Sequence, residues 1–292
     1  MIQDKTNPEF YQELFKRNQP IVPPSTQEKI KQLRLLVAGC GSTGGAFIEG
    51  ASRLGVMQYR LVEPDTYALN NLNRQFVYPS DIGLNKAIAH KKRIELLFNK
   101  QADVFVDERG VQPDNIDSLL KNIDVVFDAV DVTTESGIKA KLLLHEVAAE
   151  KRLLVLSALD LGYKQWIRVY DYRKNSVPLD GNLEKAKACR NPLKALIEGF
   201  CPVEELSIEI TDELIRLLKD PSASACQLGA ACHLLAAFSA PILIRICDDK
   251  SLPRLIEFDL MRTLETNEER NQAAFNVKPK HEQLKQILKS LA

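Results

Sequence analysis

The chain has no excess charge and no feature that directs it to a membrane or to nucleic acid. Its 39 Lys and Arg residues balance 39 Asp and Glu residues, so the formal net charge is zero. No field of one sign therefore draws the whole protein to nucleic acid or to anionic lipid. Residues 1–5 are polar, so we expect no signal peptide. These absences predict a cytoplasmic protein that binds neither a membrane nor nucleic acid.

Long uninterrupted hydrophobic runs are also missing. The most apolar stretch, residues 223–247, is interrupted by Gln227, His233 and Arg245, which predicts a buried helix and not a membrane span. Hydrophobic residues make up 45% of the chain and charged residues 27%, which is ordinary for a soluble globular protein. A length of 292 residues suits one large α/β domain or two small ones.

The six cysteines show no close pairing. No Cys-x-x-Cys pair occurs, and a tetrahedral thiolate zinc site needs such pairs, so we expect no structural zinc of that kind. Cysteines scattered through a chain of this size without an export signal predict reduced thiols and not disulfides.

What the sequence does contain is a glycine loop at a predicted strand-to-helix turn. An apolar run, residues 33–38, leads into Gly39, and residues 46–55 have the composition of a helix. Gly39 permits the tight turn, Gly41 lets the backbone approach a phosphate, and Gly44 lets the helix pack on the strand. The helix start presents free N–H groups and a positive dipole end to an anion. The loop, with Ser42 in it, therefore predicts a nucleotide phosphate site.

A second predicted strand, residues 58–63, ends in an acidic residue. Glu63 lies 63 − 39 = 24 positions after Gly39. This is the expected position of a carboxylate that binds the ribose hydroxyls. Strand, glycine loop, helix and acid in this register predict nucleotide binding.

The rest of the chain alternates strands with helices as far as residue 172. Further strands are predicted over 102–107, 124–130, 152–158 and 165–172, and helices over 85–99, 112–122 and 134–150. This alternation predicts an α/β, Rossmann-like doubly wound fold, with a mostly parallel sheet and helices on both faces.

After residue 172 the alternation stops. Residues 175–201 are polar, contain two prolines and show no clean period, which predicts a long excursion. Later elements are predicted as helices over 204–219 and 222–247, a strand over 255–260 and an amphipathic helix over 281–291. We therefore expect a single domain made of an N-terminal helical arm (1–32), a core (33–172), a crossover region (173–221) and a C-terminal helix, strand and helix (222–292).

A polar cluster follows the second strand, with Asp65, Asn71, Arg74 and Gln75 close together in the sequence. A dinucleotide dehydrogenase has no need of this cluster, whereas an enzyme that holds a triphosphate does. The planar guanidinium of Arg74 suits bidentate phosphate contact, and the alternative is a surface salt bridge. Asn71 can donate to a phosphate oxygen, although turn formation would explain it equally. Gln75 similarly suits a β- or γ-phosphate contact.

Two further charged residues stand at element ends. Lys86 is at the start of a predicted helix, where the dipole disfavours a cation, so a phosphate ligand would justify it. The alternative is a solvated surface lysine. Asp131 follows the fourth strand, at the edge where this fold binds ligands, and it suits magnesium carried by phosphates. The alternative for Asp131 is a helix N-cap.

In this order and spacing, these motifs resemble the ThiF/MoeB-type adenylyltransferases, which are bacterial relatives of the ubiquitin-activating enzymes. The resemblance covers residues 15–260 and is strongest over 33–131. It is carried by residues 39–44, 63–66, 71–75, 83–86 and 128–131. It implies binding of ATP with Mg²⁺, attack of a C-terminal carboxylate on the α-phosphate and release of pyrophosphate. Arg17 matches a family arginine that reaches the partner subunit's ATP, which implies a homodimer; the alternative is a solvated N-terminal arginine.

The chain also departs from the family. Members often carry two Cys-x-x-Cys zinc pairs, which are absent here, and usually Asp where this chain has Glu63. Cys226 lies roughly where some members place a nucleophilic cysteine, and Cys189 and Cys201 also lie on polar segments. The alternative for each is a small buried hydrophobic residue.

Three classes of function follow. The first is adenylation of a carboxylate on a ubiquitin-like sulfur carrier or on a precursor peptide that is tailored into a natural product. The second is an NAD- or FAD-dependent oxidoreductase that shares the glycine loop. The third is a degenerate family member that only binds a nucleotide or a partner. Arg74, Lys86 and Asp131 favour the first class.

Overall fold

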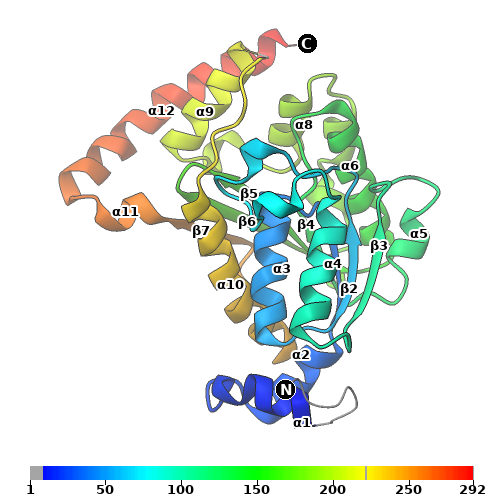
Figure 1. Cartoon of the computed structure of the whole chain (residues 1–292). Coiled ribbons are helices and arrows are strands. Elements are labelled where there is room, and N and C mark those ends of the chain that lie inside the picture. Colours follow the sequence, from blue (N-terminus) through cyan, green and yellow to red (C-terminus); the bar gives the residue numbers. More distant parts are fainter. Residues whose placement is uncertain (1–8, 221, 292) are drawn as a thin grey trace.

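The computed structural model describes residues 9–220 and 222–291 and contains one seven-stranded sheet (Figure 1). Residues 1–5, on which the expectation about a signal peptide rests, lie outside the described residues. The strand order is β3-β2-β1-β4-β5-β6-β7. Neighbours from β3 to β5 run parallel, and β6 and β7 join antiparallel. The strands are β1 Arg34–Ala38, β2 Gln58–Val62, β3 Asp103–Asp107, β4 Val125–Asp128, β5 Leu154–Leu161, β6 Lys164–Asp171 and β7 Leu255–Asp259. The predicted doubly wound, mostly parallel α/β fold is confirmed.

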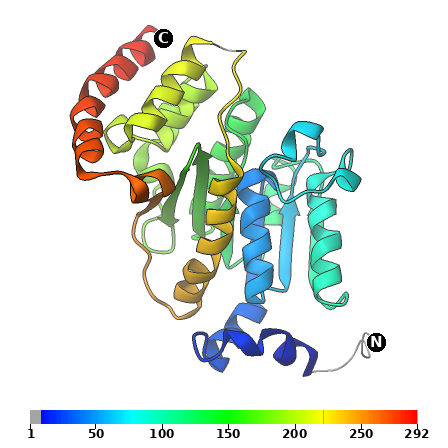
Figure 2. The same ribbon diagram turned by 60° about the vertical axis from the view of Figure 1, so that its left-hand side comes forward.

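Helices cover both faces of the sheet (Figure 2). One core contains side chains of α1 (Glu9–Phe15), α2 (Pro24–Gln32), α3 (Ser42–Leu54), α4 (Lys86–Leu97) and α10 (Gly229–Cys247). The other contains side chains of α5 (Ile116–Leu119), α6 (Glu135–Glu150), α7 (Leu183–Lys187), α8 (Pro192–Gly199), α9 (Ile208–Lys219) and α12 (Asn267–Ser290). A short helix, α11 (Leu260–Leu264), joins β7 to α12.

The central strand β1 explains why the sheet needs both layers. Leu35 and Val37 lie in the core beneath α3, while Leu36 and Ala38 lie in the opposite core. Successive side chains of a strand point to opposite faces, so a strand buried on both sides is an uninterrupted apolar run. The glycine loop begins at Gly39, directly after this buried strand.

The predicted excursion over 175–201 is wrong, because this segment contains α7 and α8. These helices have five and eight residues, too few to show a helical period. The start of α8 carries local signals instead: Asn191 caps it by accepting from the Lys194 N–H, and Pro192 takes the first position. The terminal helix is also longer than predicted and begins after Thr266, which forms a capping box with Glu269.

The apolar helix predicted over 222–247 begins only at Gly229, because residues 222–228 form an irregular crossover segment. By length and composition alone, α10 is apolar enough to cross a membrane, and 39% of its most apolar stretch is buried. It packs closely on α3, since a Cβ on Gly50 would lie 2.0 Å from Ser239 Oγ. Ala237 and Pro241 are exposed on its other side. The prediction of a buried helix therefore holds for one face of α10 only.

Candidate functional site

The glycine loop connects β1 to α3 at the carboxyl edge of the sheet. Gly39 has φ +85°, and a Cβ there would lie 2.2 Å from the Ala129 carbonyl oxygen. A Cβ on Gly44 would lie 1.7 Å from the Gly39 carbonyl oxygen. Only glycine fits these two positions. A Cβ on Gly41 would lie 3.7 Å from the Gln75 side chain, so the loop faces Gln75 at this point.

A neutral histidine packs behind the loop. His90 is buried, and its Nε2 lies 3.0 Å from the Tyr67 hydroxyl. A Cβ on Gly45 would lie 2.6 Å from the same nitrogen. Burial lowers the pKa of His90 to about 3, so the ring supports the helix start without adding charge.

The two acids after β2 have different surroundings. Glu63 is 5% exposed, and its carboxylate accepts the backbone N–H groups of Cys40 at 2.6 Å and Asp65 at 2.9 Å. Burial raises the pKa of Glu63, and Lys86 opposes the shift. Both carboxylate oxygens are therefore engaged in holding the glycine loop against the end of β2. The side chain of Asp65 is 61% exposed, so Asp65 is the more accessible of the two acids to a ligand.

Lys86 starts α4 just after the N-cap Asn85, whose side chain accepts from the Ile88 N–H. Its side chain is 11% exposed, and Nζ lies 3.0 Å from Asp65 Oδ2. The alternative of a solvated surface lysine is therefore wrong. Lys86 is a nearly buried cation at the carboxyl edge of the sheet, with an exposed carboxylate as its partner.

In the segment after β2, Gln75 faces the loop at Gly41, and Arg74 is connected to Ser42 of the loop through Gln227. Arg74 donates to the Asn70 carbonyl, to Asn73 Oδ1 and to Gln227 Oε1, which are all neutral acceptors. No carboxylate of the described residues forms an ion pair with it, so the salt-bridge alternative is wrong. Gln75 Oε1 is buried without a partner within the described part of the chain.

Asn71 has a local role in this structure. Its Oδ1 accepts from the Ala68 N–H at 2.9 Å, closing a short turn. This is the turn-forming role that was its alternative. Its Nδ2 lies 3.4 Å from Asn70 Oδ1, close to the limit of a hydrogen bond.

Strand β4 carries two aspartates with opposite surroundings. Asp131, after the strand end, is exposed, and its Oδ1 accepts from the Thr133 N–H and hydroxyl, each at 2.8 Å. It is not the N-cap of α6, because Thr134 takes that role by accepting from the Gly137 N–H. Asp128, inside the strand, is fully buried.

Asp128 belongs to a buried charge network within the sheet. It pairs with Lys141, and it accepts from Ser157 at 2.8 Å and lies 2.9 Å from His145 Nε2. Burial alone would raise the pKa of Asp128, but Lys141 and His145 outweigh it and hold the pKa well below its usual range.

Sequence reasoning missed Asp160 and the contacts of Gln227. Asp160, on β5, is 5% exposed and accepts from Ser42 Oγ at 2.9 Å and Thr43 Oγ1 at 3.0 Å. Gln227 bridges Asp160 and Arg74 from the crossover segment. The available signal was an acid inside the apolar run 153–161, since buried acids are rare without a purpose.

The N-terminal helices α1 and α2, between which Arg17 lies in the chain, are at the opposite end of α3 from the glycine loop (Figure 1). Arg17 is exposed, and the neighbouring Asn18 donates to the Leu54 carbonyl at the last residue of α3. The 13 residues of α3 span about 20 Å at 1.5 Å per residue. Arg17 is therefore separated from the loop of its own chain by the length of this helix.

Cys226 is the one exposed cysteine of the six, all of which lie in described segments. Its Sγ lies 3.7 Å from Arg216 Nη2, and its backbone N–H donates to Glu213. Burial raises the pKa of the Cys201 and Cys232 thiols to about 12, which removes their thiolate form near neutral pH. Cys189 is half-buried and its pKa is also raised.

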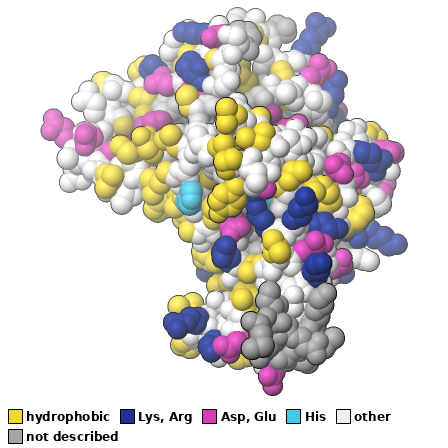
Figure 3. All heavy atoms as spheres, in the orientation of Figure 1, with side chains coloured by type: hydrophobic (Ala, Val, Ile, Leu, Met, Phe, Trp, Pro, Cys, Tyr) yellow, Lys and Arg dark blue, Asp and Glu magenta, His cyan; other side chains and the backbone are white. Residues whose placement is uncertain are grey.

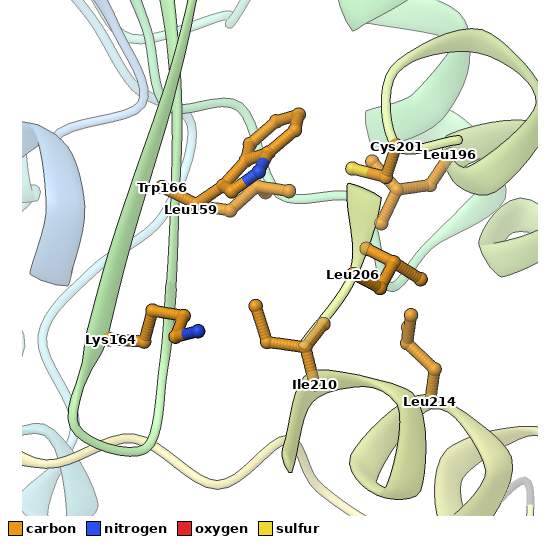
Figure 4. Close-up of a pocket in the computed structure, with 8 residues that line it drawn as sticks. All are labelled: Leu159, Lys164, Trp166, Leu196, Cys201, Leu206, Ile210 and Leu214. Carbon is orange, nitrogen blue, oxygen red and sulfur yellow. The ribbon is translucent and has the colours of Figure 1, made fainter. Parts of the chain in front are cut away.

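A small apolar cavity lies between strands β5 and β6 and helices α8 and α9 (Figure 4). Its volume is about 20 Å³, which holds little more than one water-sized group. It is lined by Leu159, Lys164, Trp166, Leu196, Cys201, Leu206, Ile210 and Leu214. It is a packing void and not a nucleotide site.

The residues present fit a nucleotide phosphate with its metal. Arg74 has no acidic partner among the described residues, and a Cβ at Gly41 would meet nothing closer than the Gln75 side chain at 3.7 Å, so the loop leaves room there. The amide nitrogen of Gln75 can donate to a phosphate oxygen. In the described residues, no three His, Cys, Asp or Glu side chains gather as a metal site. Magnesium does not require one, because it usually binds through one or two carboxylates together with substrate phosphates.

Comparison with known proteins places this site in a family. The chain is 28% identical over 144 residues to the sulfur carrier protein ThiS adenylyltransferase of Bacillus subtilis, which covers 48% of this chain and 41% of that relative. The match thus spans less than half of the relative's length. Among solved structures, E. coli MccB with MccA-N7isoASN has a TM-score of 0.61 at 16% identity, covering 87% of this chain and 70% of that one. E. coli tRNA N6-threonylcarbamoyladenosine dehydratase with AMP has a TM-score of 0.57 at 16% identity, covering 82% and 95%.

At these identities the solved structures establish a shared fold. The family itself is established by a model of the ThiF family, which matches residues 15–284. The chain belongs to the ThiF family.

Proposed function

We propose that this protein is an ATP-dependent adenylyltransferase that transfers AMP to a carboxylate. The observation that carries the proposal is Arg74, a cation that Gln227 connects to Ser42 of the glycine loop and that, among the described residues, has only neutral acceptors. A positive group that the protein leaves without an acid is suited to the charge of a triphosphate and of its transition state. Membership of the ThiF family and the adenylyltransferase named among its relatives support this reaction.

The reaction is an exchange of bonds at the α-phosphorus. A carboxylate oxygen of the acceptor forms a bond to phosphorus, the bond between phosphorus and the α,β-bridging oxygen breaks, and pyrophosphate leaves. Arg74 and Lys86 offset the repulsion between carboxylate and triphosphate, and the loop N–H groups hold the phosphates. Asp65 binds the ribose hydroxyls, and Gln75 donates to a phosphate oxygen.

Asp131 would hold the magnesium ion together with the phosphates. It is an exposed carboxylate directly after β4, and no described residue hydrogen-bonds to its Oδ2. The ion would supply Lewis-acid stabilisation of the phosphate oxygens. The single carboxylate suits the way Mg²⁺ binds at phosphate sites.

The acceptor is a protein or a peptide: a ubiquitin-like sulfur carrier or a precursor peptide. The surface over β7 and α11 exposes Phe258, Met261 and Leu264 (Figure 3), and such apolar surface is typical of contact with another polypeptide. The six unpaired thiols suit a cytoplasmic protein, where thiols stay reduced.

We further propose a homodimer in which Arg17 completes the site of the partner. Arg17 is exposed and lies a helix length from its own glycine loop. The apolar helix α10, which exposes Ala237 and Pro241, offers surface for a second copy. A two-fold dimer would contain two such shared sites.

The test is calorimetry of the purified chain with ATP–Mg²⁺ and, separately, with NAD. We expect ATP to bind and NAD not to bind. An oxidoreductase would give the reverse result, which would overturn the proposal. ATP–pyrophosphate exchange in the presence of acceptor then separates an active enzyme from a family member that only binds nucleotide.

A further inference from the structure

The crossover segment, residues 222–228, carries a side chain that touches the candidate phosphate-binding arginine. Gln227 Oε1 accepts from Arg74 Nε at 2.6 Å. The amide nitrogen of the same side chain donates to Asp160 Oδ1 at 2.7 Å and to Ser42 Oγ at 3.2 Å. One glutamine thus connects the arginine, a buried acid and the first residue of the glycine-loop helix.

Asp160 decides which end of the Gln227 amide faces Arg74. An ionised carboxylate can only accept hydrogen bonds, so it selects the amide nitrogen and turns the amide oxygen toward the guanidinium. Asp160 is held in turn by Ser42, Thr43 and Cys232, which donate at 2.9, 3.0 and 3.4 Å. It forms no ion pair with any described lysine, arginine or histidine, so its charge is balanced by neutral donors alone.

The donors of Arg74 divide into two groups. A guanidinium has five N–H donors in a fixed fork. Nε uses its one donor on Gln227, and Nη1 donates to the Asn70 carbonyl at 2.8 Å and to Asn73 Oδ1 at 2.9 Å. Within the described residues Nη2 has no partner, which leaves its two donors for a ligand.

We propose that Gln227 and Asp160 are positioning residues that fix the Arg74 guanidinium with its Nη2 donors toward the nucleotide phosphate. This inference rests on the proposed function. The chemical reason for a glutamine is charge: a carboxylate at position 227 would also accept from Nε, but it would neutralise the cation that the phosphate needs. The amide orients Arg74 and leaves its charge available.

The experiment uses four variants of the full chain: Gln227→Ala, Gln227→Glu, the double variant Gln227→Glu with Asp160→Asn, and Leu228→Ala as a control from the same segment. For each we would measure the thermal midpoint, the Kd of ATP–Mg²⁺ by calorimetry, and KM and kcat for exchange. The wild type must bind ATP first. If it does not, the proposed function fails, and this result is distinct from any result on the variants.

We expect Gln227→Ala to weaken ATP binding about tenfold, because a charge-assisted hydrogen bond that orients the arginine is lost. Leu228→Ala should leave the Kd within about twofold, since its partly exposed side chain forms no hydrogen bond to Arg74. A folded Gln227→Ala protein with the ATP affinity and kcat of the wild type would overturn the proposal.

The double variant separates positioning from a structural role. Gln227→Glu alone sets two carboxylates side by side, which should lower the thermal midpoint. Adding Asp160→Asn restores a donor–acceptor pair and keeps the same number of charges, so the midpoint should recover. We expect ATP affinity to stay at least about tenfold below wild type, because the new carboxylate pairs with Arg74. Recovery of both the midpoint and the affinity would mean that Gln227 serves packing alone.

Discussion

Two aspartates at the end of β4 lie three residues apart and have opposite surroundings. Asp128 is fully buried, with Lys141, His145 and Ser157 as partners. Asp131 is exposed, and among the described residues its side chain accepts only from Thr133, two positions later. The comparison shows which charged side chains have a partner inside the protein and which remain available to bind a ligand. Asp128, inside the strand, is paired with Lys141, whereas Asp131 and Arg74 at the carboxyl edge form no ion pair with any described residue.

The comparison is tested most strongly by removing Asp131. We expect Asp131→Ala to lower ATP–pyrophosphate exchange about 10³-fold, because the carboxylate that neutralises phosphate charge through magnesium is gone. Stability should change by less than about 1 kcal/mol, since the side chain is exposed. Exchange assays with urea melts would measure both. Near wild-type exchange in a folded variant would remove Asp131 from the site.

Removing the charge of Asp128, three residues earlier, should instead affect stability. We expect Asp128→Asn to lower the free energy of unfolding by about 3 kcal/mol, because Lys141 would stay buried without its counter-charge. Asp124→Asn is the matched control: its pair with Arg34 is partly exposed, so the loss should stay below about 1 kcal/mol.

The pH dependence of the Asp128 variant follows from the depressed pKa of Asp128 in the folded state. The stability that this carboxylate contributes is present above its unfolded pKa, about 4, and is lost as pH falls through the folded value. The difference in the free energy of unfolding between the wild type and Asp128→Asn should therefore become smaller below about pH 4. A constant difference from pH 7 to pH 3 would show that the ion pair is not its source.

Arg17 is a third charged side chain without a described ion pair, and it lies far from the glycine loop of its own chain. We expect Arg17→Ala and Asp131→Ala each to be inactive as homodimers. After subunit exchange, each mixed dimer should regain one intact site and about half of the wild-type activity. Mass spectrometry would verify exchange. If exchange is complete and activity does not return, Arg17 acts within its own chain or not at all.

The smallest effect is expected at the exposed thiol. Cys226→Ser should change ATP–pyrophosphate exchange by less than about twofold, because adenylation uses no thiol and the Cys226 thiol lies beside Arg216. Loss of exchange in a folded Cys226→Ser protein would contradict this. Cys201→Ser is the contrasting variant, since it would place a hydroxyl in the buried core and should lower stability.

Much of the fold was predictable because its signals are local. The central strands are buried on both faces and appear as continuous apolar runs, and each is followed by a glycine, an acid or a cap at its carboxyl end. The helices α7 and α8 were missed because short helices depend on tertiary burial of residues such as Leu183 and Leu196. The start of α10 was missed because the bridge between Gly162 and Gln227 joins residues 65 positions apart.

By itself the sequence determined the glycine loop, the succession of strands and helices along the chain as far as residue 172, and the residue types that lie at the carboxyl edge of the sheet. These features depend on hydrophobic periodicity, on the backbone conformations that glycine permits, and on the rule that the carboxyl ends of parallel strands lie at the same edge of the sheet. Only the tertiary structure decided that Glu63 holds the loop while Asp65 is exposed, that Arg74 has no acidic partner among the described residues, and that Gln227 connects Arg74 to Asp160. The physical reason is that burial and pairing are properties of side chains brought together from distant positions, and no spacing along the chain encodes which of two nearby acids is covered.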